Sequence, residues 1–247
     1  EGQHVIIKDL VRKTEKTITP DIVIAADGPL SPTAKAYGFF HPERESYYGI
    51  QAIVEGNFDP HTIKTYFGEE VCPGLFAWVV PESSTIARVG LATTKNTKYY
   101  FDKFMQEHNF TAKEIQAGTI PIYHPKQKLK HENCYVIGDA SSYVKATTLG
   151  GLVPALKQAQ ILAECILQGK EFEREIRPVQ RKMKLHLQLH RIFDKFKDHD
   201  WDTLVQYMNR SEISKILEQH TRDNPFPLVL KALWKEPRLL RFVKYLW

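Results

Sequence analysis

The sequence predicts a mixed α/β (α+β) fold in which an antiparallel sheet is inserted between two pieces of one parallel sheet. Two short apolar runs, DIVIAADG and CYVIGDA, each end in an acid next to a glycine, and we expect them to be strands of one sheet. The residues between them are rich in further strand-type runs with short links, which is typical of antiparallel pairing. A helical pattern follows from residue 171 to the end.

The first elements are predicted from apolar runs and capping residues. Residues 4–11 and 18–26 have the composition of strands. Residues 31–38 predict a short helix, because Ser31 suits the N-cap and Pro32 suits the first helical position. Residues 47–92 then contain four apolar runs separated by Gly, Pro, Asn and Ser, which predict the antiparallel block.

The later elements alternate between helix and strand before the tail begins. Aromatic residues at helical spacing predict a helix over 98–108, and the runs GTIPIY and CYVIGD predict strands. After Gly150 the spacing predicts a helix that Gly169 ends. We expect its buried face to be one apolar stripe: Leu152, Leu156, Ala159, Ala163 and Ile166.

Composition excludes some classes of protein. The chain has 247 residues, is 43% hydrophobic, and contains no apolar run near the roughly 20 residues that cross a bilayer. Three scattered cysteines without paired spacing argue against a disulfide framework or a zinc cluster, so we expect a cytoplasmic protein without a metal site. The chain begins without Met in a strand-like run, which suggests that it starts within a longer protein.

The positive charge is concentrated near the carboxyl end. Residues 1–170 hold 18 Lys and Arg against 18 Asp and Glu, whereas residues 171–247 hold 16 against 11. A basic helical tail suits an anionic lipid surface or a phosphate-bearing substrate, although solvated helix faces are an equal explanation. No nucleic-acid-binding module is present in the pattern, so we expect no nucleic-acid partner.

Acids at strand ends and glycines at a helix start indicate a ligand site. Asp27 and Asp139 each follow a predicted strand, where ligands of α/β sheets collect and where a carboxylate can accept a hydrogen bond from a sugar hydroxyl. Gly150 and Gly151 at a helix start let a ligand approach the backbone N–H groups, where the helix dipole stabilises negative charge. Each Asp-Gly pair alone is more often a simple turn.

The stretch GDASSYVKATTLGG resembles the flavin motif of the geranylgeranyl reductase family, which runs close to GDAAGxVKPTTGGG. Ala146 stands in place of the motif's proline and Leu149 in place of its first glycine. The matching positions are Gly138, Asp139, Ala140, Val144, Lys145, Thr147, Thr148, Gly150 and Gly151.

Two more stretches resemble motifs of the same family. Residues 21–38 resemble its strand followed by ADG and a serine, with matches at Asp27, Gly28, Pro29 and Ser31. FAWVVPESSTIARVGLA resembles its substrate-cavity motif, with matches at Phe76, Trp78, Pro81 and Gly90. Val80 and Ala92 depart from that motif. Aromatic residues at this spacing also commonly fill a protein core.

The resemblance implies a p-hydroxybenzoate hydroxylase-type two-domain flavoprotein whose N-terminal GxGxxG segment is not among these residues. The expected parts are a partial FAD-binding domain in two pieces (1–46 and 126–170), an inserted antiparallel-sheet substrate domain (47–125) and a helical C-terminal region (171–247). The expected FAD-binding residues are Asp27, Gly28, Gly138, Asp139, Ala140, Gly150, Gly151 and Leu152. Phe76, Trp78, Pro81 and Gly90 are expected to line the substrate cavity.

The implied reaction is reduction of C=C bonds in geranylgeranyl groups, with an isoprenoid lipid as substrate and ferredoxin or NAD(P)H as electron donor. A peripheral membrane contact is an expectation from the basic tail alone. No catalytic proton donor is identified. The alternatives are a flavin-dependent monooxygenase of the same fold and a non-catalytic prenyl- or lipid-binding protein. His186 and His190 lie four residues apart on a predicted helix, but no third metal ligand accompanies them, so we expect them on the helix surface.

Overall fold

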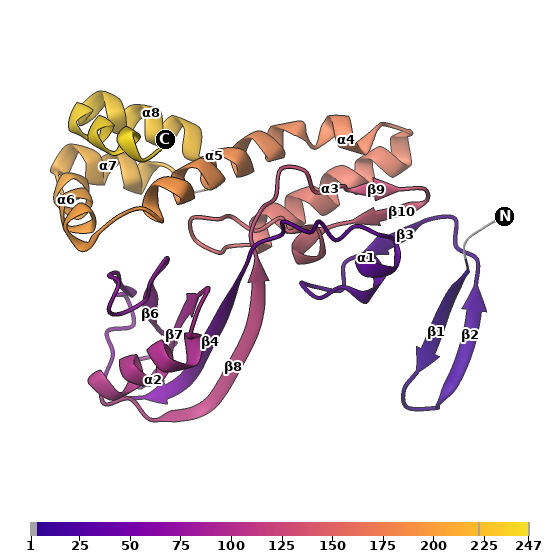
Figure 1. The fold of residues 1–247 in the computed structure, drawn as a ribbon, viewed down its shortest axis with the longest axis horizontal. Coiled ribbons are helices and arrows are strands. Elements are labelled where there is room, and N and C mark those ends of the chain that lie inside the picture. Colours follow the sequence, from indigo (N-terminus) through magenta and orange to yellow (C-terminus); the bar gives the residue numbers. More distant parts are fainter. Residues whose placement is uncertain (1–3, 222, 247) are drawn as a thin grey trace.

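The computed structural model describes residues 4–221 and 223–246. It contains a two-stranded hairpin, a three-stranded sheet, a five-stranded sheet and a set of C-terminal helices, which lie above both larger sheets in Figure 1. The mixed α/β class predicted from the sequence is confirmed.

The three-stranded sheet joins segments from either side of the inserted unit. Its order is β3 (Val23–Ala25), β10 (Cys134–Val136) and β9 (Lys130–His131). β3 and β10 pair in parallel, as expected for two strands of one sheet, whereas β9 is antiparallel to β10. Helix α1 (Pro32–Ala36) follows β3 and is capped by Ser31, as predicted.

The predicted strand over 18–26 is wrong, because the structure divides these residues between two elements. Ile18 ends β2 (Thr14–Ile18), which pairs with β1 (Val5–Asp9) in the hairpin, and β3 begins only at Val23. Pro20 lies between them and has no N–H to donate to a ladder, so the strand is interrupted there.

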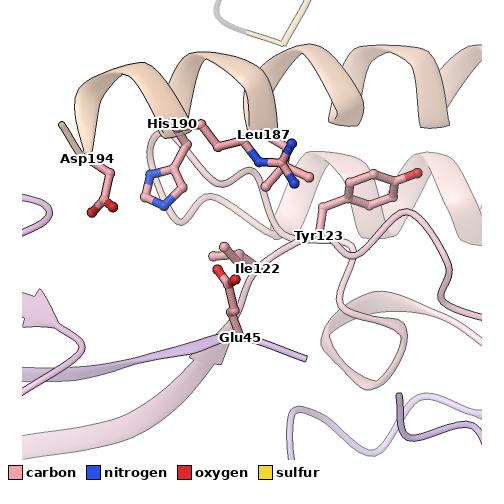
Figure 2. A pocket seen from close by; sticks show the side chains of 7 residues that line it. Glu45, Ile122, Tyr123, Leu187, His190 and Asp194 are labelled. Atoms are coloured by element: carbon pink, nitrogen blue, oxygen red, sulfur yellow. The ribbon is translucent and has the colours of Figure 1, made fainter. Parts of the chain in front are cut away.

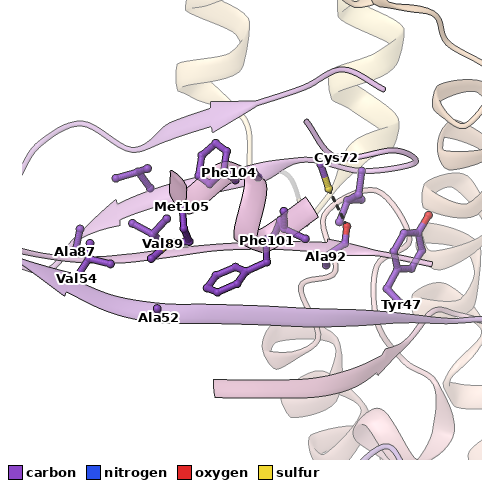
Figure 3. Packing of buried hydrophobic residues seen from close by; sticks show 14 of the residues in the cluster. Tyr47, Ala52, Val54, Cys72, Ala87, Val89, Ala92, Phe101, Phe104 and Met105 are labelled. Carbon is purple, nitrogen blue, oxygen red and sulfur yellow. Dashed lines mark hydrogen bonds between the residues drawn. The ribbon is translucent and has the colours of Figure 1, made fainter. Parts of the chain in front are cut away.

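The five-stranded sheet is antiparallel throughout. Its order is β5 (Lys64–Tyr66), β6 (Ala77–Pro81), β7 (Ile86–Thr93), β4 (Ser46–Glu55) and β8 (Ala112–Pro121). Helix α2 (Thr97–Glu107) covers one face, where Phe101, Phe104 and Met105 pack against buried Ala and Val side chains of the strands (Figure 3). Helix α2 does not cover the opposite face of this sheet, which we call the open face.

Helix α3 (Leu152–Gln168) follows the predicted flavin motif, but it buries a different face from the one we expected. Leu152 and Leu156 are 74% and 63% exposed. The buried positions are Pro154, Gln158, Leu162 and Cys165. The buried face carries the amide of Gln158 where an apolar side chain is usual, so the apolar stripe of the sequence did not indicate which face is buried.

The remaining chain is helical where it is described, as predicted. The elements are α4 (Phe172–Glu175), α5 (Arg177–Phe193), α6 (Asp198–Met208), α7 (Ser211–Gln219), α8 (Pro225–Lys235) and η2 (Pro237–Leu246). The long helix α5 runs from the three-stranded sheet towards the five-stranded sheet in Figure 1. Among the described residues, no helix combines the length and apolarity needed to cross a membrane.

A substitution at Gly90 of β7 would test how closely residues pack on the open face of the five-stranded sheet. A Cβ on Gly90 would lie 2.6 Å from the backbone oxygen of Ile50 and 2.8 Å from Cζ2 of Trp78. We expect Gly90→Ala to lower the free energy of unfolding by about 1–3 kcal/mol, because the neighbouring strand must move. Gly118→Ala in β8 is the matched control, since a Cβ there meets nothing within 4 Å. Urea unfolding of both variants measures the difference, and equal stability would contradict this account of Gly90.

Candidate functional site

The candidate site forms where β3 and β10 end. The parallel pairing continues one residue beyond the strands, with the Ile137 N–H donating to the Ala25 carbonyl at 3.0 Å. The chain then turns away on both sides, through Asp27 and Gly28 after β3 and through the short helix η1 (Gly138–Ser141) after β10. Both predicted acidic turns therefore lie at the same edge of the sheet.

Arg44 joins the two turns. Its guanidinium donates to the carbonyls of Pro29 at 2.8 Å and Asp139 at 2.9 Å, and more weakly to that of Ala140 at 3.4 Å. The guanidinium carbon also lies 4.5 Å from the centre of the Phe40 ring. Sequence analysis did not identify Arg44, because its partners are carbonyls on two segments that are remote from it in the chain.

Gln158 of α3 holds the turn after β10 from within. Its side chain is fully buried, and its Oε1 accepts hydrogen bonds from Gly138 N at 2.8 Å and Ser141 Oγ at 3.1 Å. A buried amide without partners would be unfavourable, so these bonds fix the turn and the helix relative to each other. Gln158 was also missed from the sequence, where it looked like an ordinary polar helix residue.

Asp139 and Gly151 make a close approach that a ligand can use. A Cβ on Gly151 would lie only 2.8 Å from Asp139 Oδ1, so any larger residue would displace the carboxylate. Burial raises the pKa of Asp139, and the nearby Arg44 charge opposes that change. Within the described part of the chain, no hydrogen bond reaches the Asp139 carboxylate, which leaves its oxygens available beside the first turn of α3.

Asp27 has a different environment from Asp139. Its carboxylate accepts hydrogen bonds from the Ser31 hydroxyl and, at 3.1 Å, from Thr33 N, so it stabilises the start of α1. Burial alone would raise the pKa of Asp27, but these hydrogen bonds reverse the effect and leave it lowered. Its partners are internal, and its part in cofactor binding stays a prediction.

Residues 143–150, the loop before α3, contact helix α5 and the link between α7 and α8. Lys145 Nζ lies 2.5 Å from Asp223 Oδ1, and Thr147 Oγ1 lies 2.7 Å from His186 Nδ1. Leu149 adopts a left-handed backbone conformation with φ of 51°, and its side chain packs against the core of the five-stranded sheet. The leucine that replaces the motif's glycine therefore has an apolar environment of its own.

The expectation that His186 and His190 lie on a helix surface is wrong. Both are buried, because α5 passes directly over the loop before α3 and the start of β4. His190 Nε2 lies 3.3 Å from the hydroxyl of Tyr47, which also donates to the Gly74 carbonyl at 3.2 Å. Burial lowers the pKa of His190, while Asp194 and Glu45 act in the opposite direction.

A small polar pocket of about 150 Å³ lies beside His190. In Figure 2, His190 of α5 and Asp194, directly after α5, lie on the side of Glu45, which precedes β4. Ile122, after β8, lies next to Glu45. The pocket therefore collects ionisable groups from α5 and from the segment that enters the five-stranded sheet.

The open face of the five-stranded sheet carries a shallow cavity of about 300 Å³, which we call the trough. Its lining residues are Gly49, Ile50, Gln51, Trp78, Gln116, Ala117, Gly118, Thr119 and Ile120. Trp78 pairs with Gly90 across β6 and β7, and the missing side chain of Gly90 makes room for the indole ring. Trp78 and Phe76 are only partly buried and pack against the α2 core, whose fully buried β6 members are Ala77 and Val79.

A row of aromatic rings leads from the trough to the C-terminal helices. The ring centre of Trp78 is 6.2 Å from that of Phe76, which is 5.5 Å from Phe67. Phe67 stacks on Trp201 of α6 at 4.6 Å, and Trp201 contacts Phe196 at 5.1 Å. Neither Phe67 nor Trp201 was identified from the sequence, since their proximity depends on how the helices fold back over the sheet.

The row ends at a cavity of about 660 Å³ between the sheet and the C-terminal helices. Phe193, Phe196 and Trp201 line its helical side, and the segment from Gly68 to Leu75 lines the sheet side. Cys72 lies in that segment but is fully buried, and burial raises its pKa to about 12. The thiol therefore stays protonated at neutral pH, where a thiolate would be the nucleophile.

Comparison with known proteins supports the resemblance found in the sequence. Residues 46–120 match the family described as the geranylgeranyl reductase catalytic domain. Digeranylgeranylglycerophospholipid reductase 2 of Methanothermobacter thermautotrophicus is 29% identical over 90% of this chain, which covers 61% of that protein. The corresponding reductase of Methanocaldococcus jannaschii is 26% identical over 93% of this chain, which covers 63% of that protein.

Solved structures agree on the fold. A geranylgeranyl bacteriochlorophyll reductase-like protein from Thermoplasma acidophilum aligns with 98% of this chain and 68% of its own at a TM-score of 0.75 and 20% identity. The flavin-dependent halogenase CmlS aligns with 93% of this chain and 52% of its own at a TM-score of 0.57 and 14% identity. The predicted fold of two-domain flavoproteins is thereby confirmed.

The buried His190 predicts a pH dependence of stability. Its pKa is lowered in the folded protein relative to about 6.5 in the unfolded chain, so the unfolded state binds more protons below neutral pH. Stability should therefore fall as the pH falls from 7 towards 5. We expect His190→Gln to reduce this loss by on the order of 1 kcal/mol, whereas exposed His61→Gln leaves it unchanged. Urea unfolding at both pH values measures the effect, and identical pH slopes in all three proteins would contradict it.

Proposed function

We propose that this chain belongs to the geranylgeranyl reductase family and that its full-length protein is an FAD-dependent oxidoreductase. Its reaction would saturate C=C bonds of geranylgeranyl groups in isoprenoid ether lipids. One observation carries the proposal: the match to the family's catalytic domain falls on the five-stranded sheet, β4 to β8, whose open face bears the trough. The names of the two methanogen relatives support the lipid substrate.

The residues at the end of β10 fit a flavin nucleotide. Asp139 offers a half-buried carboxylate with free acceptor oxygens, suited to a ribityl or ribose hydroxyl. Gly150 and Gly151 lead into α3, and Leu152 is its first residue. Backbone N–H groups at a helix start have no partner within the helix, and the helix dipole favours negative charge there. When bound, the reduced flavin supplies a hydride to one alkene carbon, and the other carbon takes a proton.

The chain's own contribution is to orient the two reactants and to exclude water. Arg44 and Gln158 fix the turn that carries Asp139 through hydrogen bonds within the protein. Trp78 and Ile120 provide apolar walls for an isoprenoid chain, and the glycines of the trough leave its floor open. Ferredoxin or NAD(P)H would supply the electrons.

A flavin-dependent monooxygenase is the second candidate. The fold similarity to a probable FAD-dependent monooxygenase of Pseudomonas aeruginosa, at a TM-score of 0.51 and 16% identity, favours it only at the level of fold. The two functions differ in product, since the monooxygenase adds oxygen to its substrate and consumes O₂, whereas the reductase adds hydrogen without O₂. A non-catalytic lipid-binding protein would bind no flavin.

Gly151→Ala tests the cofactor site. The new Cβ would displace the Asp139 carboxylate and the Val144 side chain, which lies 3.1 Å away. We expect FAD affinity of the full-length protein to fall about tenfold or more, equivalent to about 1.4 kcal/mol. Titration of the apoprotein with FAD, followed by flavin fluorescence, measures it. Gly118→Ala should keep the native affinity, and equal affinities for all three proteins would remove Gly151 from the cofactor site.

Mass spectrometry of lipids tests the reaction. Co-expression of the full-length gene with a geranylgeranyl lipid pathway should add two hydrogens for each saturated bond under anaerobic conditions. Trp78→Ala should lower the extent of saturation about tenfold, because a wall of the trough is lost, while Tyr99→Ala, an exposed aromatic on α2, should not. Unchanged lipid masses with flavin bound, or oxygen-containing products, would overturn the reductase proposal.

A further inference from the structure

Helix α8 carries an exposed stripe of large apolar side chains. Phe226, Leu230 and Trp234 are 66%, 60% and 76% exposed and follow one another at four-residue spacing, which places them on one face of the helix. We call these three residues the docking stripe. Single exposed apolar residues are ordinary on protein surfaces, whereas contiguous apolar patches are typical of binding surfaces, and these three residues share one helix face.

The orientation of the stripe is set by packing on the other side of α8. Ala232 joins a core cluster with Ile213 and Ile216 of α7, and Leu228 packs against the same cluster. Because that face is anchored, α8 cannot bury the docking stripe by rotating about its axis. In Figure 1, α8 lies at the outer edge of the C-terminal helices, away from both sheets.

The surroundings of the stripe are basic. Residues 225–246 contain five Lys and Arg but a single acid, Glu236. That acid is already neutralised by bonds to Arg238, at 2.5 Å, and to Arg210, at 2.9 Å. Lys235 lies beside the stripe with its Nζ 5.0 Å from the Trp234 ring centre. The following element η2 adds exposed Leu240 and Val243 near the chain's end.

We propose that the docking stripe binds the surface of an anionic lipid bilayer. The apolar side chains would enter the boundary between headgroups and acyl chains, with the indole of Trp234 at the headgroup level, while the lysines and arginines contact lipid phosphates. This inference extends the proposed function, because a substrate that is a membrane lipid must be collected from a bilayer.

The docking stripe is connected to the large cavity through directly packed residues. η2 packs on α8, and its Phe242 ring lies 4.7 Å from that of Phe196, which lines the cavity of about 660 Å³. The same helices therefore carry the docking stripe and one wall of the cavity. A bilayer bound at α8 would bring lipid chains to the side of the protein where the cavity lies.

Sedimentation with vesicles tests the proposal on the full-length protein. We expect it to pellet with vesicles of phosphatidylcholine containing about 30% phosphatidylglycerol, and to be released when the salt concentration rises from about 0.05 M to about 0.5 M. The triple variant Phe226→Ser, Leu230→Ser, Trp234→Ser should bind at least tenfold more weakly. The matched control is Ile63→Ser, Tyr99→Ser, Ile115→Ser, whose side chains are 66%, 63% and 56% exposed on the five-stranded sheet unit.

Several outcomes would overturn the inference. The first is equal vesicle binding by the wild-type protein and the stripe variant. The second is a loss of vesicle binding in the control variant as large as in the stripe variant. The third is a stripe variant that changes only the oligomeric state, which would identify a second copy of the protein as the partner. Trp234 provides a direct readout, since its fluorescence should shift to shorter wavelength with vesicles and be quenched by brominated lipid. Trp234→Phe should keep the binding and lose that signal.

The vesicle result can be separated from the proposed function. Reduction of a short-chain prenyl substrate in detergent should proceed equally in the wild-type protein and in the stripe variant, because the stripe lies outside the trough and the cofactor edge. Vesicle binding without any alkene reduction would refute the reductase proposal and keep the docking stripe. Alkene reduction without vesicle binding would refute the docking stripe alone.

Discussion

The parallel pairing of β3 with β10 is the contact on which the candidate site depends. The whole five-stranded sheet is inserted between these two strands, so their ladder brings together segments that the chain separates widely. Arg44, at the entrance to the insertion, completes the pairing by donating to carbonyls on both sides. A charged hydrogen bond of this kind is stronger than a neutral one and is half removed from water. The turns after β3 and β10, which form the candidate site, are thereby joined to the segment that enters the five-stranded sheet.

The C-terminal helices contribute to the site as well as to the surface. His186 and Asp223 contact Thr147 and Lys145 in the loop before α3, so the conformation of a local sequence motif depends on residues well over thirty positions away. Trp201 extends the aromatic row that begins at Trp78. The helical region that the sequence analysis described as a basic tail therefore contacts the loop before α3 and lines one side of the large cavity.

Much of the architecture could be predicted because it is recorded in short-range patterns. The helix after Ser31, the antiparallel block and the strand before Gly138 all have local signals of capping or period. Long-range polar contacts have no such signal. Gln158 resembled a solvent-facing helix residue, and burial of His190 depends on the path of α5 over β4. The same limit explains the misjudged face of α3, because one buried amide broke the apolar stripe there.

Two glycines show how sequence departures from a motif can be interpreted physically. Gly90 and Gly151 are both positions where a Cβ would lie too close to a neighbouring side chain, Trp78 in one case and Asp139 in the other. At such positions the neighbouring side chain occupies the space that a Cβ would fill, so any substitution of the glycine would displace that neighbour. Leu149 differs from these two glycines, because space is available for its side chain, which packs against the core of the neighbouring sheet. Its backbone is left-handed, which costs a non-glycine residue on the order of 1 kcal/mol, and the surrounding contacts offset that cost. A motif glycine is therefore replaceable where only its backbone conformation is special, and not where its empty space is occupied by a neighbour.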